Sequence, residues 1–530
     1  MNQFNIHLLD LPDEILLIIL KKLNNVDVLY SLFGINNERF ENIIRHDSFS
    51  STLNIVLSAQ NSTIFNSILN RLCSDILPQI SFNVKCLILQ PDYMERLLLT
   101  TSYPNLTSLK LLNLEYDYSL RYFIDDSPIG HILKQQITKL DLLYNKSTYL
   151  SGSSEVYTKR VYAPILNYCE KLQHLNVTSP LGLTYISLSL RYLPSNTFFS
   201  STLTYLCIIV STFVDFVYLL DGRLKNLSTL IVQFRLTDTD SSIIHNLDDL
   251  PNLKCFSLMY YGTFKEDLNP NEILSHLRRM INLEKLTLHL RFLFKTTFTD
   301  PIYLLNQFTI HMPQLTSFNF YLGMKYNKCD LLRYLSNNNI KQNYVNIRDQ
   351  TILDFVQNVN HEIVYHILTL PVQFTEFAYV GNTLPNITFN YVTDLVLYDE
   401  VPFEHEYFLR ISKTFPNLTK LNVINLTPWS YDMHISFDNV IQAHEIVEYS
   451  HLRSLDITRT SIFYVEQFFN ETKTRLPSLT ELKVFYEELR IITQDFTRQT
   501  TRRNCANVKQ LGINGFIADS KDYWSYFPLL

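Results

Sequence analysis

One short pattern recurs through most of this chain and constrains its fold more than any other feature. An apolar residue is followed by two residues, an apolar residue, one residue and a third apolar residue. Start-to-start intervals run from 22 to 35 residues, apart from one gap of 77 residues. The fourteen copies are VKCLIL (84–89), LTSLKL (106–111), ITKLDL (137–142), LQHLNV (172–177), LTYLCI (203–208), LSTLIV (227–232), LKCFSL (253–258), LEKLTL (283–288), LTSFNF (315–320), VTDLVL (392–397), LTKLNV (418–423), LRSLDI (452–457), LTELKV (479–484) and VKQLGI (508–513).

Each repeat is expected to contain one strand and one helix. The last four residues of a copy alternate between apolar and other residues, which predicts a short strand that is half-buried on one face. Between copies lie stretches that predict helices, such as 271–280, 303–312 and 439–449. One such unit cannot bury its own apolar residues, so the units should stack, with a parallel sheet on one side and helices on the other. The predicted fold class is α/β.

The gap in the pattern, residues 321–391, contains only NYVNI (343–347) and FTEFAY (374–379) as weak matches. Its length would hold two or three degenerate repeats, and a loop insertion is the alternative. We favour degenerate repeats.

Composition and charge exclude several classes of protein. Hydrophobic residues make up 46% of the chain and charged residues 18%, which is typical of a folded protein. The net charge of −6 gives no electrostatic reason to expect nucleic acid or an anionic membrane as a partner. The 7 cysteines are scattered without a C-x-x-C pair, which favours a reducing compartment and argues against a zinc site.

No motif predicts catalysis, a metal or a cofactor. The string HEIVYH (361–366) resembles the H-E-x-x-H zinc motif, but its histidines are five residues apart and would not share one helix face. Glycine-rich phosphate loops and a G-x-S-x-G elbow are missing from the sequence. We therefore expect a protein that is not an enzyme.

The N-terminal stretch LLDLPDEILLIILKKLNN contains six consecutive apolar residues, 15–20. Acidic residues precede this run and it is too short to span a bilayer, so neither a signal peptide nor a membrane helix is indicated. We expect a helix over 11–23, capped by Asp10 and apolar on every side, and two short helices over 24–35 and 36–46. A unit of about 45 residues is near the lower limit for independent stability, so it is expected to complete its core on a partner.

This N-terminal stretch resembles the F-box over residues 6–50. The match departs from the family where Ile35-Asn36 and Phe40 replace the usual Val-Cys and following Trp. The residues that match the family pattern are Leu11, Pro12, Glu14, Ile15, Ile19, Leu20, Leu23, Asp27, Val28, Leu32 and Ile35.

The repeats resemble the leucine-rich-repeat family, and Asn145 after LDLLY matches the asparagine of that family. The resemblance implies a right-handed solenoid over 81–530, joined to the F-box by a helical linker or cap over 51–80. An F-box followed by such repeats resembles the substrate receptors of Skp–cullin–F-box ubiquitin ligases. It implies a non-catalytic subunit of the cytoplasm or nucleus that binds a Skp-family adaptor, and through it a cullin.

In such a receptor the F-box holds the adaptor and the repeats hold a target protein. The adaptor-binding candidates are the matching residues given above, apart from Asp27. For the target we expect the strand residues that flank the buried ones, unless a tail or loop covers them. The target-binding candidates are Tyr205, Ile209, Ile231, Met259, His289 and Tyr321. The alternative is a repeat scaffold outside any ligase, whose N-terminal helices only cap the first repeat.

Overall fold

A computed structural model describes most of the chain, which forms two compact units. Unit 1 comprises residues 1–262, 271–286 and 308–317, and unit 2 comprises residues 263–270, 287–307 and 318–530. The described residues are 11–35, 37–56, 62–115, 128–144, 153–179, 186–191, 193–194, 196–236, 249–262, 268–294, 300–326, 345–347, 350–359, 362–399, 401–425, 445–514 and 521–530.

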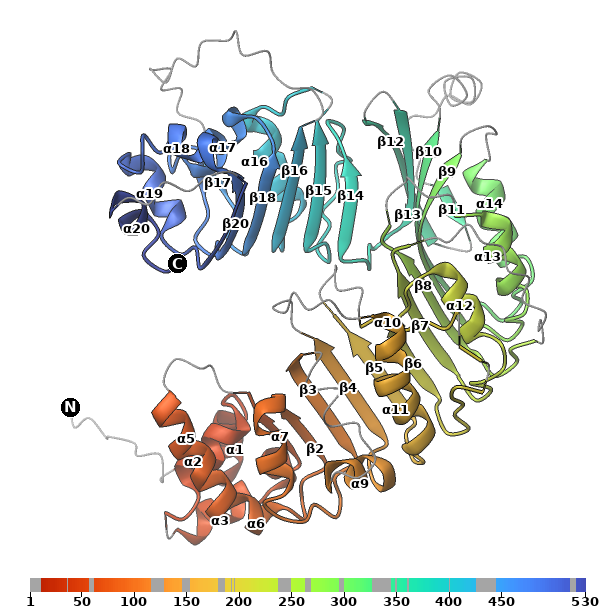
Figure 1. Cartoon of the computed structure of the whole chain (residues 1–530), viewed down its shortest axis with the longest axis vertical. Coiled ribbons are helices and arrows are strands. Elements are labelled where there is room, and N and C mark those ends of the chain that lie inside the picture. Colours follow the sequence, from red (N-terminus) through yellow and green to blue (C-terminus); the bar gives the residue numbers. More distant parts are fainter. Residues whose placement is uncertain are drawn as a thin grey trace. The chain divides into compact units, whose positions relative to one another are not determined.

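Unit 1 is a parallel sheet with helices between its strands (Figure 1). Strands β1 to β8 pair in sequence order, each parallel to the next. The strands are β1 (Thr52–Ile55), β2 (Cys86–Leu89), β3 (Ser108–Leu114), β4 (Lys139–Tyr144), β5 (His174–Thr178), β6 (Tyr205–Ile209), β7 (Thr229–Phe234) and β8 (Cys255–Tyr260). The helices are α1 (Asp13–Leu20), α2 (Asn25–Leu32), α3 (Glu38–Ile44), α4 (Asp47–Ser50), α5 (Ser62–Arg71), α6 (Leu77–Ile80), α7 (Pro91–Leu98), α9 (Pro128–Gln135), α10 (Ser154–Tyr157), α11 (Ala163–Tyr168), α12 (Phe213–Leu219) and α13 (Pro270–Leu277), with π-helical turns at Leu72–Ile76 and Thr158–Tyr162.

Unit 2 contains an antiparallel group of strands and a second parallel sheet. The parallel sheet has the order β14-β15-β16-β18-β20-β21. The strands are β9 (Lys285–Phe294), β10 (Ser317–Tyr326), β11 (Val345–Ile347), β12 (Gln350–Val359), β13 (Glu362–Thr369), β14 (Glu376–Val380), β15 (Asp394–Asp399), β16 (Lys420–Asn425), β17 (Val447–Glu448), β18 (Ser454–Arg459), β19 (Thr474–Arg475), β20 (Glu481–Phe485) and β21 (Gln510–Asn514). The helices are α14 (Pro301–Thr309), α16 (His405–Thr414), α17 (Ile462–Phe469), α18 (Tyr486–Ile492), α19 (Gln499–Cys505) and α20 (Lys521–Tyr526).

The repeated pattern marks strands throughout. Every one of the fourteen copies coincides with a strand that starts two residues after the first residue of the copy. The apolar positions of the strand point into the core: in β7, for example, Leu230, Val232 and Phe234 are at most 1% exposed, while the residues between them are half-buried. The predicted α/β class with a large parallel sheet is therefore confirmed.

Asparagines link consecutive repeats along the edge where the strands begin. The asparagine just before a copy donates its Nδ2–H to a backbone carbonyl of the preceding repeat, as from Asn252 to Lys225 O at 3.0 Å. The same bond recurs from Asn105, Asn226, Asn282, Asn417 and Asn507. The ladder thus precedes the strands, whereas the sequence suggested an asparagine after the strand at Asn145, which lies outside the described residues.

Residues 321–391 correct the expectation of degenerate repeats. Strand β13 pairs antiparallel with both β10 and β12, and β11 pairs antiparallel with β12. Within the described part of this stretch, FTEFAY alone behaves as a repeat, because it forms β14, which pairs parallel with β15. Long apolar runs such as EIVYHILT satisfy a strand of either direction, so the pattern could not reveal the direction.

The segment HEIVYH is not helical, because Glu362–Thr369 is strand β13; His361 lies outside the described residues. Two local expectations were also wrong. The linker 51–80 contains strand β1 before its helices. The helix expected over 439–449 gives way at Val447–Glu448 to the short strand β17, and residues 439–444 lie outside the described part.

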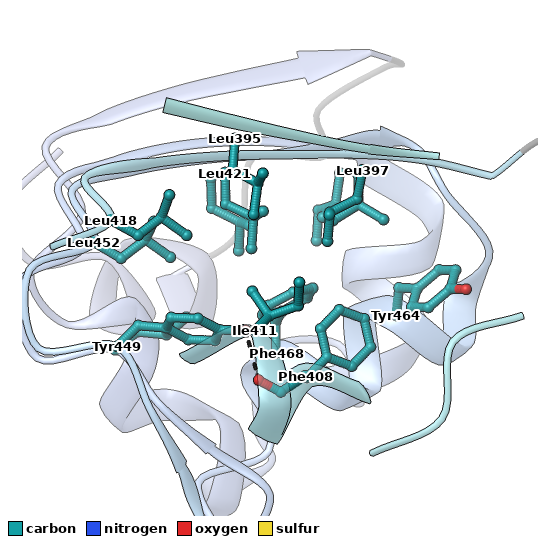
Figure 2. Packing of buried hydrophobic residues seen from close by; sticks show 14 of the residues in the cluster. Leu395, Leu397, Phe408, Ile411, Leu418, Leu421, Tyr449, Leu452, Tyr464 and Phe468 are labelled. Atoms are coloured by element: carbon teal, nitrogen blue, oxygen red, sulfur yellow. Dashed lines mark hydrogen bonds between the residues drawn. The ribbon is translucent and has the colours of Figure 1, made fainter. Parts of the chain in front are cut away.

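The core of unit 2 lies between its parallel sheet and helices α16 and α17. Figure 2 shows Leu395 and Leu397 of β15 and Leu421 of β16 above Phe408 of α16 and Phe468 of α17. The Tyr449 hydroxyl donates to the carbonyl of Phe408 at 3.1 Å, so this buried polar group is satisfied.

Candidate interaction surfaces

Helix α1 is shorter than the sequence suggested, spanning Asp13–Leu20. Pro12 occupies the N-cap position, and Asp10, the expected cap, lies outside the described residues. Proline is tolerated here because the first N–H groups of a helix have no partner within the helix. Asp13 and Glu14 in the first turn favour the positive end of the helix dipole.

One side of α1 is buried and the other is exposed and apolar. Leu16 is 0% and Leu20 is 5% exposed. Ile15 is 43%, Ile18 58% and Ile19 40% exposed, and Leu23 just beyond the helix is 54% exposed. We call Ile15, Ile18, Ile19 and Leu23 the α1 surface. Their helical spacing of three and four residues places the three isoleucines on one face.

The predicted adaptor-binding residues divide by exposure. Leu20 and Val28, at 5% and 2% exposed, are part of the core of the module and are not available to a partner. Leu11 and Leu32 are half-buried. The exposed candidates are Pro12, Glu14, Ile15, Ile19, Leu23 and Ile35. Ile18 was not among the candidates, although it is the most exposed residue of the α1 surface.

The N-terminal module, residues 11–50, also covers the first strand of the sheet. Helices α2 and α4 contact β1. The side chain of Asn25 donates to the carbonyls of Ser48 and Thr52, each at 3.0 Å, and so ties α2 to α4 and to β1. The module therefore caps the edge of the sheet with α2 and α4, and this contact leaves the α1 surface exposed.

A second surface lies on strands β6 to β8 of unit 1. The candidates Tyr205, Ile209, Ile231 and Met259 are all half-buried. The last three lie between buried neighbours along their strands, and Tyr205 lies between exposed Thr204 and buried Leu206. The register places Ile209 of β6 two strands from Met259 of β8, through Gln233 of β7. We call Tyr205, Ile209, Ile231 and Met259 the unit 1 strand surface.

A polar group adjoins the unit 1 strand surface. The ring of His174 stacks on Tyr205 with centroids 3.9 Å apart, and His174 Nε2 lies 3.5 Å from Asp141 Oδ1. Lys139 Nζ is 3.8 Å from the other oxygen of Asp141. Burial, and then the charge of Lys139, lower the pKa of His174 despite the nearby Asp141. The stacked pair is therefore an aromatic contact with a neutral imidazole at neutral pH.

Two buried polar atoms next to this surface have no hydrogen-bond partner in the described part of the chain. They are Asn176 Oδ1 and Ser257 Oγ. Both residues belong to the same register row as Cys207 and Ile231. A buried polar atom without a hydrogen-bond partner is unfavourable in free energy. A ligand that offers hydrogen bonds to this row would therefore bind more favourably. Ser257 was not anticipated, because a serine in an apolar copy carries no distinguishing signal.

His289 and Tyr321 are wrong as target-binding candidates. They are 2% and 1% exposed, in the interior of unit 2. The hydroxyl of Tyr321 is 3.0 Å from His366 Nδ1, and its ring contacts Phe374 at a centroid distance of 5.1 Å. His366 of β13 and Phe374 after it cover these side chains, which a regular repeat would have left accessible.

A buried ion pair lies in the same interior. The guanidinium of Arg291 contacts Glu376 Oε1 at 3.2 Å, with side chains 2% and 10% exposed. The pair joins β9 to β14, and its two residues are 85 positions apart in the sequence. Sequence reasoning missed it, although alternating His289 and Arg291 in an apolar strand is an unusual pattern for a core.

Buried neutral histidines should make the protein less stable as the pH falls. Burial lowers the pKa of His366 to about 3, and burial followed by Arg279 lowers the pKa of His276 to about 4. Burial followed by Arg291 lowers the pKa of His289 well below its usual range. The unfolded chain, with histidine pKa values of about 6.5, therefore binds more protons than the folded chain below that pH.

The stability that the neutral histidines contribute is thus present above pH 6.5. It is lost as the pH falls from 6.5 toward their folded-state pKa values. Between pH 6.5 and 5.5 each buried histidine should lower the free energy of unfolding by about 1 kcal/mol. Urea denaturation at the two pH values measures this loss, and His276→Asn should remove its share from unit 1. An equal loss with and without His276 would contradict the assignment.

Neither a group of metal ligands nor a helix that could cross a membrane occurs among the described residues. Among them no three His, Cys, Asp or Glu side chains gather as metal ligands. Burial raises the pKa of the Cys207 thiol to about 11, so it is not a thiolate nucleophile at neutral pH. In the same part of the chain, no helix combines the length and the hydrophobicity that crossing a bilayer requires.

Comparison with known proteins assigns the chain to no family. No family model matches the chain, and no curated protein is significantly similar to it.

Proposed function

We propose that this protein is a substrate-recognition subunit of a Skp–cullin–F-box ubiquitin ligase. In this proposal the N-terminal module is an F-box that binds a Skp-family adaptor, and through it a cullin, in the cytoplasm or nucleus. The repeats form a right-handed leucine-rich-repeat solenoid that binds a target protein. The contribution of the subunit is proximity, because holding the target raises its effective concentration at the enzyme that carries ubiquitin.

The α1 surface is the observation that carries the proposal. Four large aliphatic side chains are 40% to 58% exposed on a short module that already has its own core. A module that only capped the sheet would do so through α2 and α4, which contact β1. The exposed apolar residues of the α1 surface would have no role in such a cap. Exposed apolar residues that are contiguous on one helix face favour a protein partner.

The finer fold has separate support. Parallel pairing of β1 to β8 in sequence order, helices between the strands and asparagine bonds between consecutive repeats all agree with stacked leucine-rich repeats. The antiparallel strands β10 to β13 are a departure from that family.

The unit 1 strand surface is the proposed target site. It joins half-buried Tyr205, Ile209, Ile231 and Met259 to buried polar atoms of Asn176 and Ser257 that find no hydrogen-bond partner among the described residues. The parallel strands of unit 2 are less suitable, because some of their charged side chains already pair with one another, as Lys420 does with Asp394 at 2.9 Å.

Affinity capture from the cells that express the protein tests both surfaces together. Tagged wild-type chain should retain a Skp-family adaptor, a cullin and one or more further proteins, identified by mass spectrometry. Ile231→Asp should keep the adaptor and lose the further proteins, because it places a charge in the target surface alone. Capture of folded chain without any Skp-family adaptor would rule out the ligase and leave the repeat scaffold as the function.

A further inference from the structure

Strands β1 and β21, at the ends of the two parallel sheets, differ in what packs against them. In unit 1 the terminal strand β1 is contacted by α2 and α4. In unit 2 the terminal strand β21 pairs with β20, and no other described strand pairs with it. A terminal strand presents a row of backbone N–H and C=O groups along its outer edge, which can pair with another strand.

The side chains of β21 are also less covered than those of the strands before it. Leu482 and Val484 of β20 are 0% exposed. Their register partners in β21, Leu511 and Ile513, are only partly buried. Among the described residues, the apolar side chains of this terminal strand are therefore less covered than those of β20.

The C-terminal helix α20 packs against the helix layer. Tyr526 is 1% exposed, and its hydroxyl donates to the carbonyl of Arg498 at 3.1 Å. Tyr523 packs edge-on against Phe496 with ring centroids 5.1 Å apart. These contacts attach α20 to the segment around α19.

Strand β21 lacks the features that usually prevent edge pairing. Its sequence, QLGIN, contains no proline and no charged residue. The preceding strands of the sheet carry charges, such as Asp394 in β15, Lys420 in β16 and Lys483 in β20. Charged side chains and proline on an edge strand oppose association, so their absence from β21 permits it.

We propose that β21 pairs antiparallel with β21 of a second copy of this chain, around a twofold axis at Gly512. This register places Leu511 opposite Ile513 of the second copy, and Gln510 opposite Asn514. The sequence QLGIN has the same order of side-chain types in both directions: amide, aliphatic, glycine, aliphatic, amide. A twofold contact requires such self-complementarity, because each residue meets its counterpart in reverse order.

The pairing would join the two sheets and shield Leu511 and Ile513 of both copies. The contact involves one short strand from each chain, so it is small compared with a stable dimer interface. We therefore expect a reversible dimer, with a dissociation constant on the order of tens of micromolar. This inference is independent of the proposed ligase function.

A symmetric cross-link tests the register. Directly opposed residues of antiparallel strands have Cα atoms about 4.5 to 5.5 Å apart, which a disulfide can span. Gly512→Cys should therefore give a disulfide-linked dimer of the full-length chain under mild oxidation. A β-carbon at this position would lie 3.0 Å from Lys483 Cγ, so the lysine side chain has to shift by a few tenths of an ångström. The matched control is Gln510→Cys, whose two copies would be about 13 Å apart along the strands and should stay monomeric.

Sedimentation velocity of the unmodified chain supplies the second measurement. We expect a concentration-dependent dimer that Leu511→Lys abolishes and that Ile491→Lys, at a residue 47% exposed on α18, leaves intact. A monomer at all concentrations up to about 100 µM would overturn the proposal. So would a dimer that persists in Leu511→Lys, or equal cross-linking of Gly512→Cys and Gln510→Cys.

Discussion

Ile15→Lys should weaken binding of a Skp-family adaptor at least about 100-fold, which corresponds to about 2.7 kcal/mol. The side chain is 43% exposed and lies beside Ile18 and Ile19, so an adaptor that covers the α1 surface would bury it. Burying an isoleucine contributes about 1.5 to 3 kcal/mol, and lysine in its place would also have to lose its water. Isothermal titration calorimetry with purified adaptor measures the change.

This substitution should hardly change the free energy of unfolding of the chain. Exposed positions without special contacts usually change the free energy of unfolding by less than about 0.5 kcal/mol. The matched control is Ile491→Lys, because Ile491 on α18 is 47% exposed and has the same chemistry at a site outside the N-terminal module. Equal binding by the Ile15→Lys and wild-type chains would place the adaptor elsewhere and remove the basis of the proposed function.

Glu376→Gln should destabilise unit 2 by about 3 kcal/mol. The substitution keeps the shape of the side chain but leaves Arg291, whose side chain is 2% exposed, without its counter-charge. A buried charge that loses its partner is strongly unfavourable, whereas the intact pair contributes little. Chemical denaturation measures the loss, as the change in the free energy of the unfolding transition that belongs to unit 2.

The same substitution at an exposed pair provides the control. Lys413 and Glu445 in unit 2 are 3.1 Å apart with side chains 62% and 63% exposed, so Glu445→Gln should cost less than about 0.5 kcal/mol. Combining Arg291→Met with Glu376→Gln should recover most of the stability, because the unpaired charge is removed. A loss in the double variant equal to the sum of the two single losses would show that the charges do not interact.

Much of the fold was accessible from local pattern. Each copy of the repeat predicted its strand, because apolar residues that alternate over four positions can be buried only on one face of an extended chain. The position of Asn252 before its copy was visible too, but its bond to Lys225 depends on the stacking of a neighbouring repeat. Strand direction in 345–369 was not accessible, since a continuous apolar strand can pair either way.

The candidate surfaces show the same division. The sequence by itself determined that α1 carries more apolar residues than one small module can bury, and that strands recur with one face turned inward. Only the tertiary structure decided which of those residues remain available. It buried Leu20 and Val28 in the module, and His289 and Tyr321 in unit 2, and left the α1 surface and the unit 1 strand surface accessible. The physical reason is that periodicity reports which side of an element is apolar, whereas exposure depends on distant segments that pack against it.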